Sequence, residues 1–271
     1  MSNKIGVAII TCDREEFFKQ CVNSIPEVDS LIVINDGFQY NNDCYPKRVK
    51  EVFQHTRNKS VGISKNEALR FLVQDGCDHI FLCEDDIIIK NPDICRKYIH
   101  TAEISGIWHL NYGGHGIYNR NQQTGEAVVK NIVKYTDDVS VDFYHNILGA
   151  WSYYLRGIIK SIGYMDEHYV NAFEHVDHTY QIIQKGLHPP FWWFADAHES
   201  WKDIEDIKKY HEGSVIRKNQ AEWQKNFNNA CSWFQHKHGF IPMQMPETPQ
   251  ERVGAILETI QQSYARNVLN G

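Results

Sequence analysis

Short apolar runs with β-strand character alternate with segments of helical periodicity in the first part of the chain, and this alternation restricts the fold more than any other feature. Strands are expected at residues 5–11, 31–34 and 79–83, and helices at residues 14–24, 64–74 and 91–100. Ser64 and Glu67 form a capping-box pattern at the start of the second helix. Such alternation is typical of βαβ units, so we expect an α/β fold with a mostly parallel sheet flanked by helices.

Each expected strand of this region ends in polar or charged residues. These are Thr11, Asp13 and Arg14 after the first strand, Asp36 after the second, and Glu84, Asp85 and Asp86 after the third. Ligands of parallel sheets bind beyond the carboxyl ends of the strands, so these side chains should converge on one crevice. The stretch "IFLCEDDIIIKNPD" places three adjacent carboxylates between two apolar runs, where a positive charge must offset their repulsion. Carboxylates are hard oxygen ligands, which favours a divalent cation such as Mn²⁺ or Mg²⁺.

The second half of the chain has a different pattern but no segment with the composition of a linker. From about residue 106 it predicts short strands and turns, and "FWWFADA" predicts a further strand. Residues 248–271 predict a C-terminal helix, with Thr248 as N-cap and Pro249 at the first helical position. Its apolar stripe either packs on the body or forms a dimer surface; it consists of Val253, Ile256, Leu257, Ile260 and Tyr264. We expect one domain over residues 1–247, with halves at 1–105 and 106–247.

Composition excludes several classes of protein. The chain has 271 residues, of which 42% are hydrophobic and 23% charged, as in ordinary globular proteins. Its seven cysteines are scattered and form no C-x-x-C pair, which argues against a disulfide framework or a zinc ribbon. The net charge of −6 disfavours nucleic acid as a partner. No transmembrane segment and no signal segment is expected, so we predict a cytoplasmic protein, which could associate with the inner face of a membrane.

An ordered series of motifs resembles the family 2 glycosyltransferases, which have the GT-A fold and use nucleotide-diphospho-sugars. The motifs are "VAIITCDREEFFKQCVNSI", "LIVINDG", "NKSVGISKNEALRFLVQDGCDHIFLCEDD" and "LRGIIKSIGYMDEHYVNAFEHVDHTYQIIQKG", and together they span roughly residues 4 to 200. The resemblance implies a Rossmann-like, mostly parallel sheet with a smaller sheet on the acceptor side. It also implies an inverting, metal-dependent transferase of hexosyl or N-acetylhexosaminyl groups. The donor would be a nucleotide-diphospho-sugar, with UDP as the expected carrier, and the acceptor a carbohydrate hydroxyl, as in polysaccharide or glycoconjugate synthesis.

The resemblance also implies roles for individual residues. Donor-binding candidates are Thr11, Asp13, Arg14, Asp36, Lys65, Asn66, Glu84, Asp85, Arg217 and Lys218. Asp86 would coordinate the metal at the diphosphate, and His198 would complete that site. Glu174 is the expected catalytic base, with Asp177 as the other candidate, because "EHVD" stands where the family has E-D-x-D. Trp151 and Tyr153 are candidates for stacking on the acceptor sugar.

Three other functions compete with this prediction. A sugar-nucleotide pyrophosphorylase would need a glycine-rich phosphate loop after its first strand, and "TCDREEF" contains no glycine. A non-catalytic carbohydrate-binding protein would explain the aromatic residues but not the acidic triplet. A transferase that glycosylates modified DNA bases is disfavoured by the negative net charge.

Overall fold

The structure is a computed structural model that describes residues 3–208 and 218–269. Its main sheet has six strands in the order β3-β2-β1-β4-β9-β6. These strands are β1 (Ile5–Thr11), β2 (Ser30–Asn35), β3 (Val49–Gln54), β4 (His79–Glu84), β6 (His109–Asn111) and β9 (Trp151–Leu155). β3, β2, β1 and β4 are parallel, and β9 is antiparallel to both β4 and β6. The predicted mostly parallel sheet is therefore confirmed, and its parallel part comes from the first half of the chain.

Helices cover both faces of this sheet, because its strands are apolar on both sides. One face packs on α1 (Glu15–Ser24), α3 (Ile94–Ser105) and α8 (Gln250–Leu269). The other packs on α2 (Val61–Gln74), α4 (Arg156–Ile162) and α5 (Glu174–Gln184). Along β1, Val7 and Ile9 face the first layer, whereas Ala8 and Ile10 face the second. The alternation of side chains along a strand thus joins the two apolar layers through one sheet.

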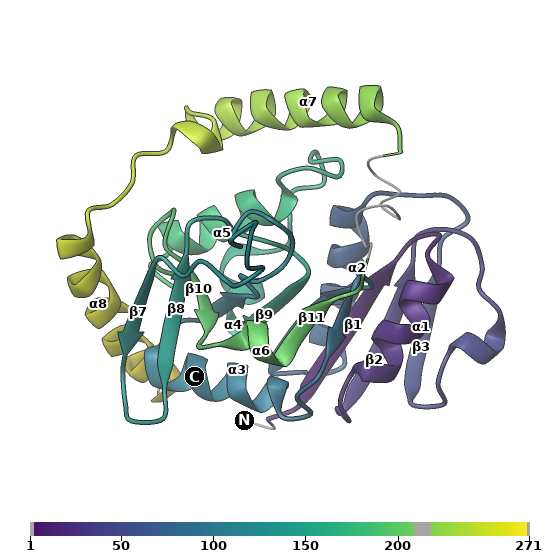
Figure 1. Cartoon of the computed structure of the whole chain (residues 1–271), viewed down its shortest axis with the longest axis horizontal. Coiled ribbons are helices and arrows are strands. Elements are labelled where there is room, and N and C mark those ends of the chain that lie inside the picture. Colours follow the sequence, from purple (N-terminus) through teal and green to yellow (C-terminus); the bar gives the residue numbers. More distant parts are fainter. Residues whose placement is uncertain (1–2, 209–217, 270–271) are drawn as a thin grey trace.

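Two smaller sheets lie beside the main one (Figure 1). Antiparallel strands β7 (Asn131–Lys134), β8 (Ser140–Tyr144) and β10 (Phe194–Ala197) form the first, which is the smaller sheet that was expected. Strand β5 (Ile87–Ile89) follows the acidic triplet and pairs with β11 (Ile204–Asp206), which comes after the short helix α6 (Ser200–Asp203). Single turns of 3-10 helix lie at Asn42–Cys44 and Pro242–Gln244. The division at residue 105 does not separate the sheets, since β6 and β9 complete the main one.

Helix α7 (Gln220–His238) runs across the top of the molecule in Figure 1, above α5. The C-terminal helix α8 lies along α3, where Val253, Leu257 and Ile260 are buried. Its apolar stripe therefore packs on the body and is not exposed as a dimer surface. Among the described residues, no helix combines the length and the apolar character that crossing a bilayer requires.

Helix α2 begins earlier than predicted. It starts at Val61, so Ser64 is a buried residue inside the first turns and not the N-cap. The N-cap is Ser60, whose backbone has a φ of 99° and whose side chain makes no capping bond. Asp36 instead accepts the backbone N–H groups of Lys59 and Ser60, so a distant carboxylate fixes the chain at this helix start.

Candidate active site

The carboxyl ends of β1, β2 and β4 meet at one edge of the main sheet. Thr11 lies opposite Asn35 of β2, and Ile10 lies opposite Glu84 of β4. Parallel pairing in this register brings the three predicted strand ends together, as the sequence indicated. The loops that follow them form the walls of a crevice.

Arg14 is the protein's own counter-ion for two of the three adjacent acids. Its guanidinium group forms ion pairs with Asp85 and, at 3.2 Å, with Asp86. The Thr11 hydroxyl donates a second bond to Asp85, over 2.5 Å, and Asp85 has no exposed surface. Burial alone would lower the pKa of Arg14, but the surrounding carboxylates outweigh burial and raise the pKa above its usual range. This pairing allows a cluster of acids to be buried at a strand end.

Lys65 is the counter-ion on the other side of the cluster. Its Nζ lies 2.8 Å from Oε1 of Glu84 and 3.4 Å from Oε1 of Glu174, and only 2% of the residue is exposed. Burial opposes the charge of Lys65, but the two carboxylates raise its pKa above the usual range. Lys65 therefore links the acidic strand end of β4 to the first residue of α5.

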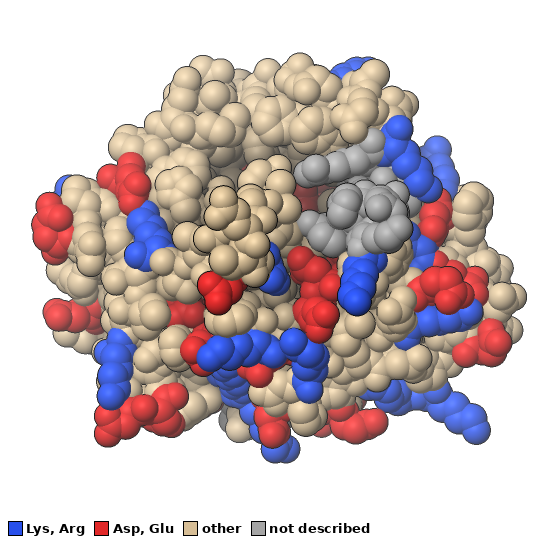
Figure 2. Space-filling model, in the orientation of Figure 1, with Lys and Arg blue, Asp and Glu red and all other residues tan. Residues whose placement is uncertain are grey.

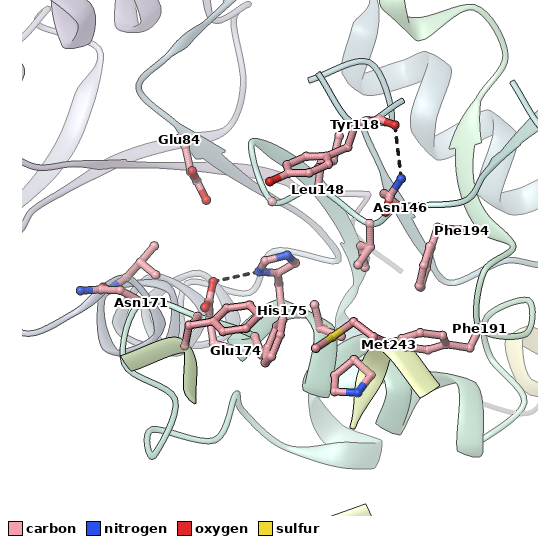
Figure 3. A pocket seen from close by; sticks show the side chains of 18 of the residues that line it. Glu84, Tyr118, Asn146, Leu148, Asn171, Glu174, His175, Phe191, Phe194 and Met243 are labelled. Carbon is pink, nitrogen blue, oxygen red and sulfur yellow. Dashed lines mark hydrogen bonds and ion pairs between the residues drawn. The ribbon is translucent and has the colours of Figure 1, made fainter. Parts of the chain in front are cut away.

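Glu174 is buried, and its carboxylate is held in the ionised form. Burial would raise its pKa, but His175 and Lys65 lower the pKa well below its usual range. His175 Nδ1 lies 3.0 Å from Glu174 Oε1, and this contact is drawn as a dashed line in Figure 3. Glu174 is thus ionised at neutral pH and can accept a hydrogen bond from a substrate hydroxyl that reaches it, whereas a pKa lowered in this way makes the carboxylate a weaker base.

Asp13 and Asp36 hold the loops that surround the crevice. Asp13 accepts the backbone N–H of Phe38 over 2.6 Å. Asp36 lies 2.6 Å from Nδ1 of His55 and accepts the two backbone bonds at the start of α2. Both acids lie at the predicted edge, but their carboxylates are engaged by the protein in this structure.

Two adjoining cavities open at this edge. The smaller measures about 110 Å³ and is lined by Thr11, Arg14, Asp36, Asn58 and Asp86, among others. The larger measures about 410 Å³ and contains Glu174 and His175 in its wall. Val61, Glu84 and Asn171 line both, so Glu84 stands between the two spaces. In the space-filling view the surface is hollowed beneath α7 (Figure 2).

Asp86 has one oxygen suited to a metal ion. Its Oδ2 pairs with Arg14, whereas Oδ1 is buried and has no hydrogen-bond partner in the described part of the chain. A buried carboxylate oxygen without a partner is costly, and a hard cation would satisfy it. Residues 3–208 and 218–269 hold no group of three His, Cys, Asp or Glu side chains arranged for a metal. An ion bound to Asp86 would therefore need further ligands that these side chains do not supply.

His198, predicted to complete the metal site, is placed differently. Its Nδ1 lies 2.7 Å from Oδ1 of Asp142 on β8, and it lines neither of the two cavities. His115 is the histidine beside the acidic cluster, and its Nδ1 lies 2.8 Å from Asp206 on β11. Burial lowers the pKa of His115, but Asp86 and Asp206 outweigh it and raise the pKa to about 9. The sequence analysis did not identify His115, because β11 and its pairing with β5 were not predicted.

Three other predicted site residues lie in the interior. Trp151 and Tyr153 are fully buried in β9, where they pack on Phe81, so they cannot stack on an acceptor. Asn66 is fully buried and lines neither of the two cavities. Its side-chain amide nitrogen and oxygen both form hydrogen bonds with the backbone of Met165.

Asp177 also has a structural environment. It has no exposed surface, and it accepts bonds from Tyr169, Gln181, Lys237 and His238. It therefore anchors the C-terminal end of α7 to α5 and is not placed to act as a base. Lys218 is exposed just before α7, and Arg217 lies outside the described residues.

Comparison with known proteins supports the fold. No protein-family model and no curated protein sequence matches the chain. The mannosyltransferase PcManGT from Pyrobaculum calidifontis, in complex with GDP-Man and Mn²⁺, matches with a TM-score of 0.54 and 10% identity over 97% of this chain and 73% of its own. GalNAc-T7 with UDP, GalNAc and Mn²⁺ also gives 0.54 and 10%, over 100% of this chain and 57% of its own.

TarS from S. aureus, residues 1–349, matches with 16% identity and a TM-score of 0.46 over 65% of this chain and 54% of that one. The chain thus spans between about half and three quarters of the length of these structures. At such low identity the likeness concerns architecture alone. The chain has the GT-A fold, as in PcManGT and GalNAc-T7.

Proposed function

We propose that the chain is an inverting, metal-dependent glycosyltransferase that moves a sugar from a nucleotide-diphospho-sugar to a carbohydrate hydroxyl. The observation that carries this proposal is the pair of adjoining cavities, with Asp86 and Arg14 in one, Glu174 in the other and Glu84 in both. In this arrangement the smaller cavity would hold the donor and the larger cavity the acceptor, and the two meet at Glu84. UDP remains the expected carrier, and a hexosyl or N-acetylhexosaminyl group the expected cargo.

The smaller cavity suits the diphosphate end of the donor. Asp86 lines this cavity, and its Oδ1, which has no hydrogen-bond partner in the described residues, could bind a cation that accompanies the diphosphate. Mn²⁺ or Mg²⁺, when bound there, would act as a Lewis acid on the leaving diphosphate. Such ions accompany the nucleotides in PcManGT and GalNAc-T7, which supports the same cofactor here.

The larger cavity suits the acceptor. Its hydroxyl oxygen would form a bond to the anomeric carbon while the bond from that carbon to the diphosphate breaks and the diphosphate keeps the electron pair. Glu174 would take the hydroxyl proton, because its carboxylate is ionised and borders this cavity. Lys65 would hold Glu174 in position through their 3.4 Å contact. Attack from the side opposite the leaving group inverts the anomeric configuration.

An assay with a panel of nucleotide sugars tests this function. Donor hydrolysis or transfer should require Mn²⁺ or Mg²⁺ and stop with EDTA. Asp86→Asn should lower turnover roughly 100-fold or more, and Glu174→Gln should lower transfer by about 10² to 10⁴ while donor binding persists. Asp137→Asn, on a fully exposed side chain, is the matched control. Metal-independent turnover that both site variants retain would refute the proposal.

A further inference from the structure

The larger cavity is polar at one end and apolar at the other. Figure 3 shows Glu84, Asn171, Glu174 and His175 on one side of the space, and Phe191, Phe194 and Met243 on the other. The charged end is where the proposed base and the donor space lie. The apolar end would therefore hold the part of the acceptor that is remote from its reacting hydroxyl.

Two side-chain N–H groups near the apolar end are already engaged by the protein. The Nε1 group of Trp192 donates to the carbonyl of Met245 over 2.6 Å. The Asn146 amide donates to Oδ1 of Asn119 over 3.1 Å and to the carbonyl of Tyr118 over 3.3 Å. Sugar hydroxyls that moved against Phe191, Phe194 and Met243 would lose water without gaining partners from these three side chains. An apolar group would gain free energy from the same transfer.

Two aromatic residues of the cavity wall have unusual backbone conformations. Phe173 has a φ of 65° and Trp192 a φ of 69°, values that bulky side chains rarely adopt. Neighbouring rings fix both side chains: the rings of Phe173 and Phe227 are 5.1 Å apart, and Trp192 stacks on His145 at 4.5 Å. Strain of this kind persists only where the surroundings impose it, and it concentrates at ligand sites.

Apolar side chains also remain exposed on the cavity lining. Tyr118 is 61% exposed and Met243 is 50% exposed, and both line the larger cavity. A bound apolar group would cover them. The rings of Phe191 and Phe194 meet edge to face at 5.1 Å, the arrangement that aromatic rings prefer, and a ring of the acceptor could pack on them in the same way.

We propose that the acceptor is a glycoside whose aglycone is aromatic, with the sugar hydroxyl at Glu174 and the aglycone ring among Phe191, Trp192, Phe194 and Met243. This inference rests on the proposed transferase function, because that function defines which end of the cavity is reactive. It narrows the acceptor from any carbohydrate to one that carries an apolar ring.

Calorimetric binding of paired glycosides, in the presence of UDP and Mn²⁺, tests the inference on the full chain. The pairs are phenyl and methyl β-glycosides of glucose, galactose and N-acetylglucosamine. The phenyl member should bind at least about tenfold more tightly than the methyl member for at least one sugar. Met243→Gln should reduce this ratio about threefold or more, because it places an amide at the apolar wall. Ile132→Gln changes an equally exposed residue on β7, outside the cavity, and should keep the wild-type ratio.

The outcomes distinguish failure of the aromatic acceptor from failure of the transferase function. A ratio within about twofold for every pair, or no binding of any phenyl glycoside, would overturn the aromatic acceptor. A tenfold ratio that Met243→Gln leaves unchanged would also overturn it, because the ring would then bind elsewhere. A ratio that behaves as expected, with no transfer from any nucleotide sugar, would retain the aromatic site and refute the transferase.

Discussion

Replacing Lys65 with methionine should destabilise the protein severely. Lys65 is 2% exposed, and its Nζ pairs with Glu84 at 2.8 Å and with Glu174 at 3.4 Å. Methionine keeps the length of the side chain but removes its charge, so two carboxylates lose their shared cation. Removal of one partner of a buried ion pair costs about 3–5 kcal/mol. Because the Glu84 side chain is 27% exposed and can gain some water, we expect a loss near the lower end, about 3 kcal/mol.

Urea denaturation followed by tryptophan fluorescence measures this loss, since the chain has seven tryptophans. With an m value of roughly 3 kcal/mol/M, a loss of about 3 kcal/mol lowers the urea midpoint by about 1 M. Lys19→Met is the control: it removes an exposed lysine that pairs with Glu15 and Glu16 on α1, and it should cost no more than about 1 kcal/mol. If Lys65→Met costs as little as the control, the buried bridge does not contribute to stability as argued.

Two further changes test the interior. Burial lowers the pKa of His188 to about 4, and its Nε2 accepts the N–H of Ala195, so unfolding takes up a proton between roughly pH 6.5 and 4. As the pH is lowered through that window, His188 should reduce the free energy of unfolding by up to about 1.4 kcal/mol per pH unit. His188→Gln should make this pH dependence less steep in urea titrations at stepped pH. Gly37→Ala should lower stability by about 1–3 kcal/mol, because its Cβ would collide with Asp13. Gly254→Ala in α8 meets no neighbour and should raise the melting temperature; equal effects of the two alanines would contradict this account of Gly37.

The sequence could predict the strand ends because they depend on local patterns. Apolar runs that stop at polar residues located β1, β2 and β4, and the rule for parallel sheets then brought Thr11 and Glu84 to one edge. Glu174 was identified from a motif, and the structure places it in the wall of the larger cavity. These inferences needed no knowledge of how distant segments pair.

The predicted site residues that the structure places away from the two cavities depend on distant pairing. Trp151 was an acceptor candidate because aromatic rings can stack on sugars, but β9 lies inside the main sheet, which buries it. Asp177 stands one helical turn after Glu174, yet its partners Lys237 and His238 come from α7, some 60 residues later. His198 follows β10 and contacts Asp142 on β8, whereas His115 contacts Asp206 on β11 and lies beside the acids. No local pattern contains this information.

The charges around the acidic triplet explain why we expect a metal even though the protein supplies its own cations. Arg14 is committed to Asp85 and Asp86, and Lys65 to Glu84. Either cation could neutralise a phosphate only by releasing a buried carboxylate, which is unfavourable. A divalent ion at the free oxygen of Asp86 would bring its own charge and leave both pairs intact. The protein's cations therefore stabilise its own acidic cluster, and we expect the donor diphosphate to bind with its metal ion.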